Sequence, residues 1–280
     1  MDENTYIDDS LVTCAEYQLF IDEMRVLGIY CQPDHWTSDQ FSANHALEPI
    51  LGVRHSDAIA FCEWLTQRES ADWTYRLSYF GEAIAYPING PSLKLVGYWV
   101  TKKTDDIQFV WTSLVASKTF ELYSERILKK FIRRFRLLES DVNQVLILKS
   151  IRNCPLNLGD TFYQSEGDNR LAYSISHNGL DYSTATTIHH DALPVVIQSS
   201  TTSGTLDIDY AFDRTFIHDK ASAIHKALEN LQAIISKPPA DDRSTRSLEF
   251  IIYLTLFILR ERVAGRSPAF EGIRLVKERK

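Results

Sequence analysis

Side chains that could bind a metal ion occur together in one polar stretch of this 280-residue sequence. His189 and His190 are adjacent and precede Asp191, and imidazole and carboxylate groups are common metal ligands. Adjacent residues of an extended segment point to opposite sides, so a single site would use both histidines only with difficulty. The nearby histidines are scattered and add no ligand spacing: His177, His218 and His225. A surface loop is the favoured interpretation, and we expect no metal ion or other cofactor.

The four cysteines are the next candidates for chemistry, as nucleophiles or as zinc ligands. They contain no C-x-x-C pair and are too sparse for a disulfide scaffold, which favours reduced thiols in a cytosolic protein. Cys62 lies on the apolar face of a predicted helix without a basic neighbour, as a buried structural thiol does. Cys14 lies near a helix start, which can lower a thiol pKa, but no histidine partner is evident. The sequence therefore predicts no catalytic residue.

A cluster of positive charge lies within a helix predicted over residues 113–139. Its candidate partner-binding residues are Arg126, Lys129, Lys130, Arg133 and Arg134. Such a face can be simply solvated, can dock an acidic partner or another domain, or can bind nucleic acid or a membrane. The net charge of -7 disfavours broad attraction to nucleic acid, and no membrane partner is expected.

Aromatic and polar side chains provide candidates for ligand binding. Tyr98, Trp99 and Trp111 could form an aromatic platform, although aromatic residues of a hairpin more often belong to the core. The stretch 160–210 is rich in serine and tyrosine, and tyrosine offers a large contact area with few rotatable bonds. Its candidate ligand-binding residues are Tyr173, Asn178 and Tyr182.

The elements that would position these residues begin with a capping box. Thr13 and Glu16 have the spacing in which each side chain satisfies the other's free backbone amide, and Gly28 should end that helix. Ser56 is expected to cap a second helix. Three later segments are predicted to be strands: residues 74–80, 96–100 and 109–111. The last two, separated by a polar turn, are expected to form a β-hairpin.

The second half of the chain is less regular. Residues 156–212 predict loops and short strands, and helices are expected over 219–236 and 243–264. The apolar run 251–259 is too short to span a membrane and predicts a buried helix. Residues 1–9 are acidic and do not resemble a signal peptide.

Several motifs occur in the order found in the formylglycine-generating-enzyme (sulfatase-modifying-factor) family. Residues 12–20 resemble the family's V-T-x-x-E-Y-x-x-F helix, and Pro33, His35 and Trp36 resemble its proline–histidine–tryptophan patch. The strongest likeness is residues 49–65, which resemble P-V-x-x-V-S-W-x-D-A-x-A-Y-C-x-W-L.

Two further motifs extend this resemblance. Residues 75–83 resemble Y-R-L-P-T-E-A-E, and residues 272–274 resemble the closing G-F-R strand. The resemblance implies an α+β fold of the C-type-lectin-like kind, with a helical insertion before the last strand. The implied parts are a body over 1–112, a helical and loop-rich insertion over 113–264, and a closing strand over 265–280. Arg274 in that strand should pair with a buried carboxylate, for which Glu82 is one candidate.

The departures from the family bear on activity. Its cysteine-oxidising members bind copper through a late cysteine pair, whereas the late part of this chain has Cys154 alone. Related iron-dependent sulfoxide synthases use a histidine cluster with an H-x-x-x-E helix motif, and we expect no such site here. Catalytic activity is therefore not implied by the resemblance.

Degenerate domains of this family point to the expected function. Some are variable ligand-binding proteins of diversity-generating retroelements, and others are C-terminal modules of bacterial NACHT-type defence and signalling proteins, which residues 268–274 resemble. We expect a non-catalytic binding or sensor module with a protein partner or ligand, within a larger protein or assembly. The alternatives are a metal-dependent oxidoreductase in which His177, His189 and His190 converge, and a structural subunit that packs through the basic helix and residues 251–259.

Overall fold

The chain divides into two compact units, and its first and last residues belong to the same one. Unit 1 comprises residues 1–122 and 268–280, and unit 2 comprises residues 123–267. The sequence analysis placed the corresponding boundaries after residues 112 and 264. The computed structural model describes residues 4–69, 72–88, 95–101, 107–135, 163–164, 171–177, 180–184, 195–202, 205–212, 221–222, 224–225, 228–229, 232, 253 and 257–279.

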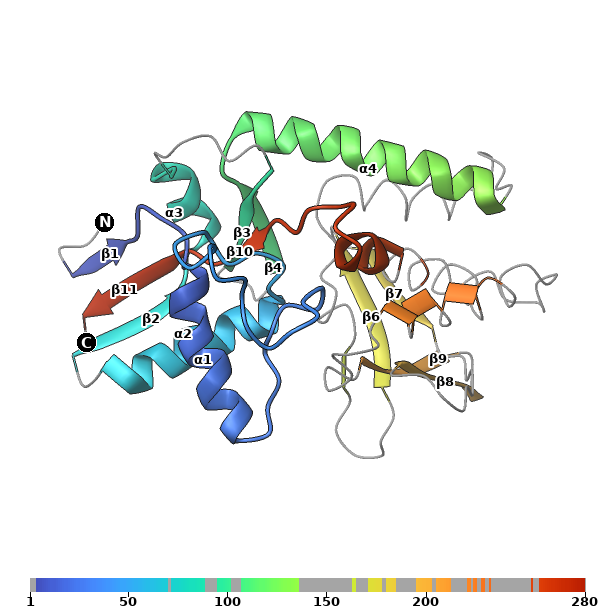
Figure 1. Cartoon of the computed structure of the whole chain (residues 1–280), viewed down its shortest axis with the longest axis horizontal. Helices are drawn as coiled ribbons and strands as arrows, with labels where there is room; N and C mark the ends of the chain where they lie inside the picture. The colour runs from blue at the N-terminus through green and yellow to red at the C-terminus, as the bar shows by residue number, and fades with distance from the viewer. Residues whose placement is uncertain are drawn as a thin grey trace. The chain divides into compact units, whose positions relative to one another are not determined.

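A three-stranded antiparallel sheet in unit 1 brings the two ends of the chain together (Figure 1). Its strands are β1 (Thr5–Ile7), β11 (Leu275–Arg279) and β2 (Trp73–Leu77), in the order β1-β11-β2. Thr5 lies opposite Glu278, and Leu275 lies opposite Leu77. The last strand of the chain is therefore the central strand of this sheet.

The C-terminal segment also enters the second sheet of unit 1. This sheet has the order β10-β3-β4, with β10 (Glu271–Gly272) parallel to β3 (Gly97–Thr101). Strand β4 (Ile107–Trp111) pairs with β3 in antiparallel fashion, which confirms the predicted hairpin. Residues 271–279 thus contribute a strand to both sheets.

Three helices complete unit 1: α1 (Cys14–Val26), α2 (His55–Glu69) and α3 (Phe80–Ala85). The capping box is confirmed, because Thr13 Oγ1 accepts the Glu16 amide and the Glu16 carboxylate accepts the Thr13 amide at 2.7 Å. Gly28 follows α1 with φ +76°, where glycine is favoured. The expected Ser56 cap is wrong: the Ala58 amide donates to the Arg54 carbonyl, so α2 begins at His55 and Ser56 lies inside its first turn.

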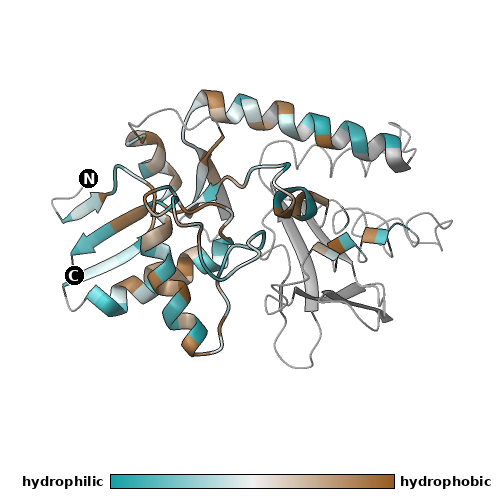
Figure 2. Ribbon diagram, viewed as in Figure 1, coloured by the Kyte–Doolittle hydropathy of each residue, from teal (hydrophilic) through white to brown (hydrophobic). Residues whose placement is uncertain are grey.

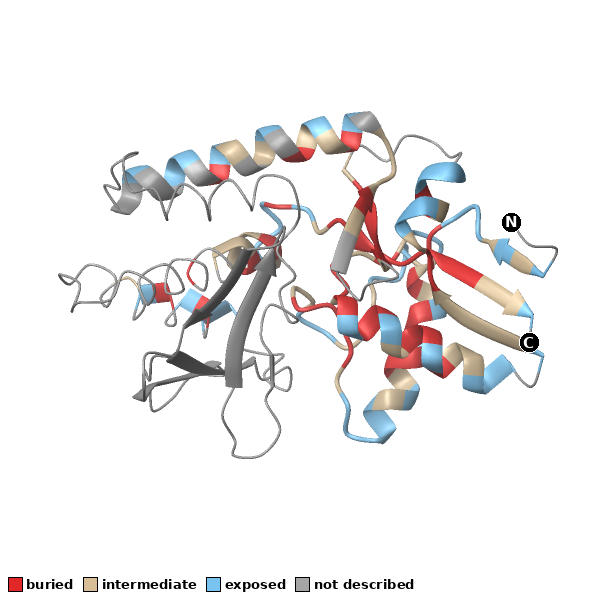
Figure 3. Cartoon of the chain, turned by 180° about the vertical axis from the view of Figure 1, so that it is seen from behind, coloured by how far each residue is buried: buried red, intermediate tan, exposed pale blue. Residues whose placement is uncertain are grey.

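Aromatic side chains dominate the core of unit 1. Phe20, Phe61 and Trp64 pack with ring centroids 5.5 to 5.6 Å apart, and Tyr17 joins them from α1. Helices α1 and α2 carry both polar and apolar stretches (Figure 2) and both exposed and buried residues (Figure 3). Their buried apolar residues form one core cluster with Leu77, Trp99 and Leu275 of the strands. This packing is the main stabilising contribution expected in a unit with such short strands.

Unit 2 contains most of helix α4 (Leu114–Phe135) and a five-stranded antiparallel sheet. The sheet has the order β5-β6-β9-β8, with β7 paired to β6. Its strands are β5 (Tyr163–Gln164), β6 (Leu171–His177), β7 (Leu180–Thr184), β8 (Val195–Thr202) and β9 (Thr205–Phe212). The expected helices over 219–236 and 243–264 are described only in part, where their residues are helical.

Replacing Gly97 by alanine tests the close approach of β3 and β4. The new Cβ would lie 2.6 Å from the Val110 carbonyl oxygen and against the Phe109 ring, so the free energy of unfolding should fall by about 1–3 kcal/mol. The matched control is Gly81→Ala in α3, where nothing lies within 4 Å of the added carbon. Denaturant unfolding measures both, and equal stability of the two variants would contradict the packing described here.

Candidate functional site

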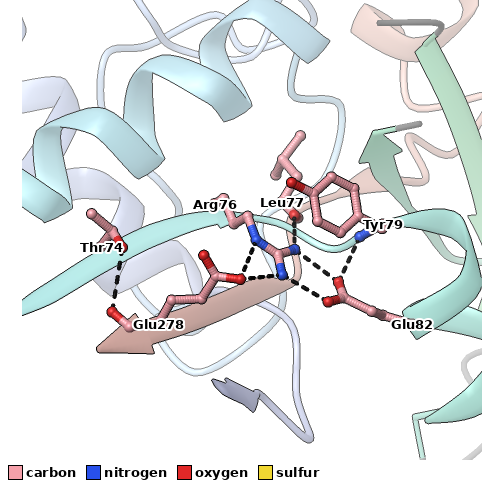
Figure 4. A network of polar contacts seen from close by, with 6 residues as sticks. All are labelled: Thr74, Arg76, Leu77, Tyr79, Glu82 and Glu278. Atoms are coloured by element: carbon pink, nitrogen blue, oxygen red, sulfur yellow. Dashed lines mark hydrogen bonds and ion pairs between the residues drawn. The ribbon is translucent and has the colours of Figure 1, made fainter. Parts of the chain in front are cut away.

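Arg76 is the centre of a polar network that joins β2, α3 and β11 (Figure 4). Its Nη1 and Nη2 donate to the two carboxylate oxygens of Glu82 at 2.8 and 2.7 Å. Its Nε and Nη2 donate to Glu278 Oε1 at 2.9 and 2.5 Å. Glu82 also accepts the Tyr79 amide at 2.8 Å, so one guanidinium and two carboxylates connect segments 202 positions apart.

The electrostatics of this network favour its charged state. Burial alone would lower the pKa of Arg76, but hydrogen bonds and charge interactions with Glu82 and Glu278 raise it above its usual value. The guanidinium carbon also lies 4.0 Å from the centroid of the Tyr79 ring. Arg76 and Glu82 belong to the segment that resembles a family motif, and their charges are engaged in joining elements.

Arg274 makes a second connection, and it differs from the expected one. The side chain is fully buried and donates to the carbonyl oxygens of Asp8 and Tyr86 and to the Tyr98 hydroxyl, at 2.8, 2.5 and 3.1 Å. The expected pair with Glu82 is wrong, because the Glu82 carboxylate is held by Arg76 and the Tyr79 amide. Arg274, which immediately precedes β11, thus satisfies the backbone carbonyls of Asp8 and Tyr86.

A buried ion pair escaped the sequence analysis. Arg54 donates through Nε and Nη2 to the two oxygens of Asp34 at 2.7 and 2.6 Å, and the Asp34 side chain is 2% exposed. Asp34 lies inside the proline–histidine–tryptophan patch, and Arg54 immediately precedes α2. The sequence offered two signals of this pair, an acid in that patch and an arginine just before a helix. The two residues are 20 positions apart, so no local pattern indicated that they are in contact.

The proposed aromatic platform is largely core. Tyr98 and Trp99 are each 1% exposed, and Trp99 Nε1 donates to the Val53 carbonyl at 2.7 Å. Trp111 is half-buried against Phe120 and Phe270, with centroids 4.7 and 5.4 Å away. Tyr98 and Trp99 therefore do not present a surface to a ligand, which agrees with the core alternative weighed above.

The remaining ligand-binding candidates lie in unit 2. Tyr173 is on β6, and Tyr182 is on β7 opposite Ile175. Asn178, in the connection between these strands, is outside the described residues, as are His189 and His190. The hairpin places Tyr173 and Tyr182 on adjacent strands.

The candidate basic residues all lie on α4. Arg126, Lys129, Lys130 and Arg133 are exposed, and Arg134 follows them in the helix. Lys129 Nζ lies 3.6 Å from a Glu125 oxygen, one turn earlier. The structure therefore brings four of these side chains to the surface of one helix.

The three cysteines of the described chain are buried, and the pKa values of two of them are raised. Burial, reinforced by Glu63 and opposed by Arg76, raises the pKa of Cys62 to about 12. Burial and the nearby Glu48 raise the pKa of Cys14 to about 11, and Cys31 is buried as well. A thiol is nucleophilic as its thiolate, so these groups are poor nucleophiles at neutral pH.

One H-x-x-x-E sequence is present at His225–Glu229, which the sequence analysis did not recognise. His225 Nε2 lies 3.4 Å from a Glu229 oxygen, with both side chains more than half exposed. In the part of the chain that the structure describes, no group of three or more potential ligands is placed to hold a metal ion. The motif here forms an exposed pair on one helical turn.

Comparison with known proteins gives no relative: no family model, no curated protein and no solved structure matches the chain. Among the described helices, none has a stretch long and apolar enough to cross a membrane.

Replacing Arg76 by lysine should lower the free energy of unfolding by about 1–3 kcal/mol. An ammonium group keeps the charge but cannot donate to Glu82 and Glu278 in the fork geometry of a guanidinium. Arg68→Lys is the matched control, because Arg68 and Glu23 form an exposed pair worth about 0–1 kcal/mol. Guanidinium chloride unfolding separates them, and an equal loss in both variants would refute the connecting role of Arg76.

The raised thiol pKa values predict slow alkylation of the folded chain. In a Cys154→Ser background, iodoacetamide at pH 7.5 should leave Cys14 and Cys62 unmodified, because their thiolate fractions rise only as the pH approaches about 11 to 12. Cys31 should also stay unmodified, because it is buried away from the reagent. Unfolding should then expose all three. Mass spectrometry of the intact chain counts the adducts, and rapid native labelling of Cys62 would show that the burial is incorrect.

Proposed function

We propose that this chain is a non-catalytic binding module, of the sensor or recognition kind, on a degenerate formylglycine-generating-enzyme scaffold with a C-type-lectin-like fold. The scaffold is unit 1, and the binding segment is the polar stretch 160–210 of unit 2. The partner is a protein or ligand, and the likeness of residues 268–274 to NACHT-associated modules supports a role in bacterial defence or signalling.

The observation that carries this proposal is that the charged motif residues of unit 1 are engaged in contacts that join its helices and strands. Arg76 and Glu82 hold each other and Glu278, and Arg274 holds three neutral oxygens. Charged groups engaged in this way stabilise a rigid framework instead of acting on a substrate. The protonated, buried Cys14 and Cys62 support the same conclusion.

The topology supports the scaffold part of the proposal. The resemblance implied a closing strand that completes the body, and residues 271–279 pair with β1, β2 and β3. The chain leaves unit 1 after residue 122, forms unit 2, and returns to unit 1 at residue 268. A framework closed in this way can carry a variable inserted segment, as loops on rigid scaffolds do in many binding proteins.

A capture experiment tests the function directly. The whole chain is immobilised beside a variant in which residues 160–210 are replaced by a short glycine–serine linker, and both are exposed to extract from the source cells. We expect one partner to be retained by the whole chain and lost from the variant. Val26→Ser with Leu27→Ser, two exposed positions at the end of α1, should retain it.

The competing outcome is an enzyme. Copper or iron bound stoichiometrically by the purified chain, together with oxygen uptake in the presence of a thiol peptide, would replace this proposal with a metal-dependent oxidoreductase. Thermal unfolding of the linker variant controls for loss of unit 1. A partner retained equally by both chains would remove residues 160–210 from the binding segment.

A further inference from the structure

Helix α4 carries a short, exposed ridge of positive charge, formed by Arg126, Lys129, Lys130 and Arg133. We propose that this ridge is a docking site for an acidic, amphipathic helical segment of a protein partner. The proposal rests on the binding function above, and it assigns a surface and a partner chemistry outside the stretch 160–210.

The spacing makes these four residues neighbours on one side of the helix. Positions i, i+3, i+4 and i+7 face the same direction in an α-helix. At a rise of 1.5 Å per residue, Arg126 and Arg133 are about 10 Å apart along the axis. Carboxylates at the same spacing on a second helix would meet these cations in register, and arginine can bind a carboxylate through two parallel hydrogen bonds.

A different side of the same helix is already used by the fold. Ala116, Phe120 and Ile127 fall on one side of α4, away from the ridge, and are 0%, 4% and 6% exposed. The alternation of polar and apolar residues along α4 is visible in Figure 2, and that of exposed and buried residues in Figure 3. An interfacial membrane helix needs a free apolar face to insert between lipids, whereas the described residues of this face, Ala116, Phe120 and Ile127, are buried.

Charge distribution favours a protein over nucleic acid. Helix α4 contains six basic and two acidic residues, although the whole chain has a net charge of -7. The Glu125 carboxylate lies 3.6 Å from Lys129 Nζ, and this acid at the edge of the ridge would repel a continuous row of phosphates. Individual carboxylates on a partner helix can avoid Glu125 and still reach Arg126, Lys130 and Arg133.

An exposed apolar side chain adds to the fit. Leu122 precedes Arg126 by about one helical turn and is 70% exposed. A peptide with an apolar residue followed by glutamates at heptad spacing would bury Leu122 while pairing with the ridge. A nucleic-acid backbone would gain nothing from this leucine, whereas a protein helix would gain apolar burial.

Binding of a defined peptide to the full chain tests the inference. The probe is a fluorescent helical peptide of about 20 residues with leucine followed by glutamates at i, i+3, i+4 and i+7 spacing. The variant Arg126→Glu, Lys130→Glu and Arg133→Glu should weaken binding about tenfold or more, and added salt should weaken binding to the original chain. These three positions leave the Lys129–Glu125 pair in place.

Matched variants and competitors distinguish the outcomes. Arg133→Glu alone should weaken binding more than Arg279→Glu, which makes the same charge change at an exposed position of β11. Far-ultraviolet circular dichroism must show that α4 is retained. No binding of the acidic peptide, or tighter binding of a 20-base-pair duplex or of phosphatidylserine vesicles, would overturn the proposal.

The two proposals fail in different ways. If the peptide does not bind but capture through residues 160–210 succeeds, the ridge is a solvated face and the binding function stands. If light scattering shows self-association that the triple variant abolishes while the peptide remains unbound, the ridge instead contacts a second copy of the chain. Both results contradict docking of an acidic partner helix.

Discussion

The pairing of β11 between β1 and β2 is the constraint on which unit 1 depends. Neither outer strand contacts the other in this sheet, so the last strand supplies both sets of inter-strand hydrogen bonds. Side-chain contacts of Arg76 add to these backbone hydrogen bonds, because its guanidinium donates to Glu278 of β11 and to Glu82 of α3 at the same time. The short strands are thus supplemented by charge-assisted side-chain contacts.

Arginine residues perform the same task at three places. Arg54 holds Asp34 in the loop before α2, Arg76 joins three elements, and Arg274 collects two backbone carbonyls and a tyrosine hydroxyl. Each guanidinium offers five donors in a fixed plane, which suits irregular segments whose carbonyls have no regular partner. These three arginines therefore serve the architecture of unit 1, and the binding function proposed above leaves their contacts undisturbed.

Local signals predicted local structure well. The Thr13–Glu16 capping box and the β3–β4 hairpin are set by residues close in sequence, and both were found. Contacts between distant segments were not predictable in this way. Glu82 was one candidate partner for Arg274 on residue type alone, whereas in the fold its carboxylate is bound by Arg76, and Arg274 donates to oxygens from three distant segments. The core alternative for Tyr98 and Trp99 could be favoured from the hairpin alone, but the pairing of β3 with β10, more than 170 residues later, could not be predicted.

The central position of β11 has a consequence for synthesis of the protein. While the ribosome is still making residues 268–279, β1 and β2 have emerged but their shared neighbour has not. Their unpaired edges can attach to other nascent chains, which is the general hazard of open strands during folding. Unit 1 therefore has to remain unfinished, in a state that chaperones can shield, throughout the translation of the intervening 145 residues of unit 2.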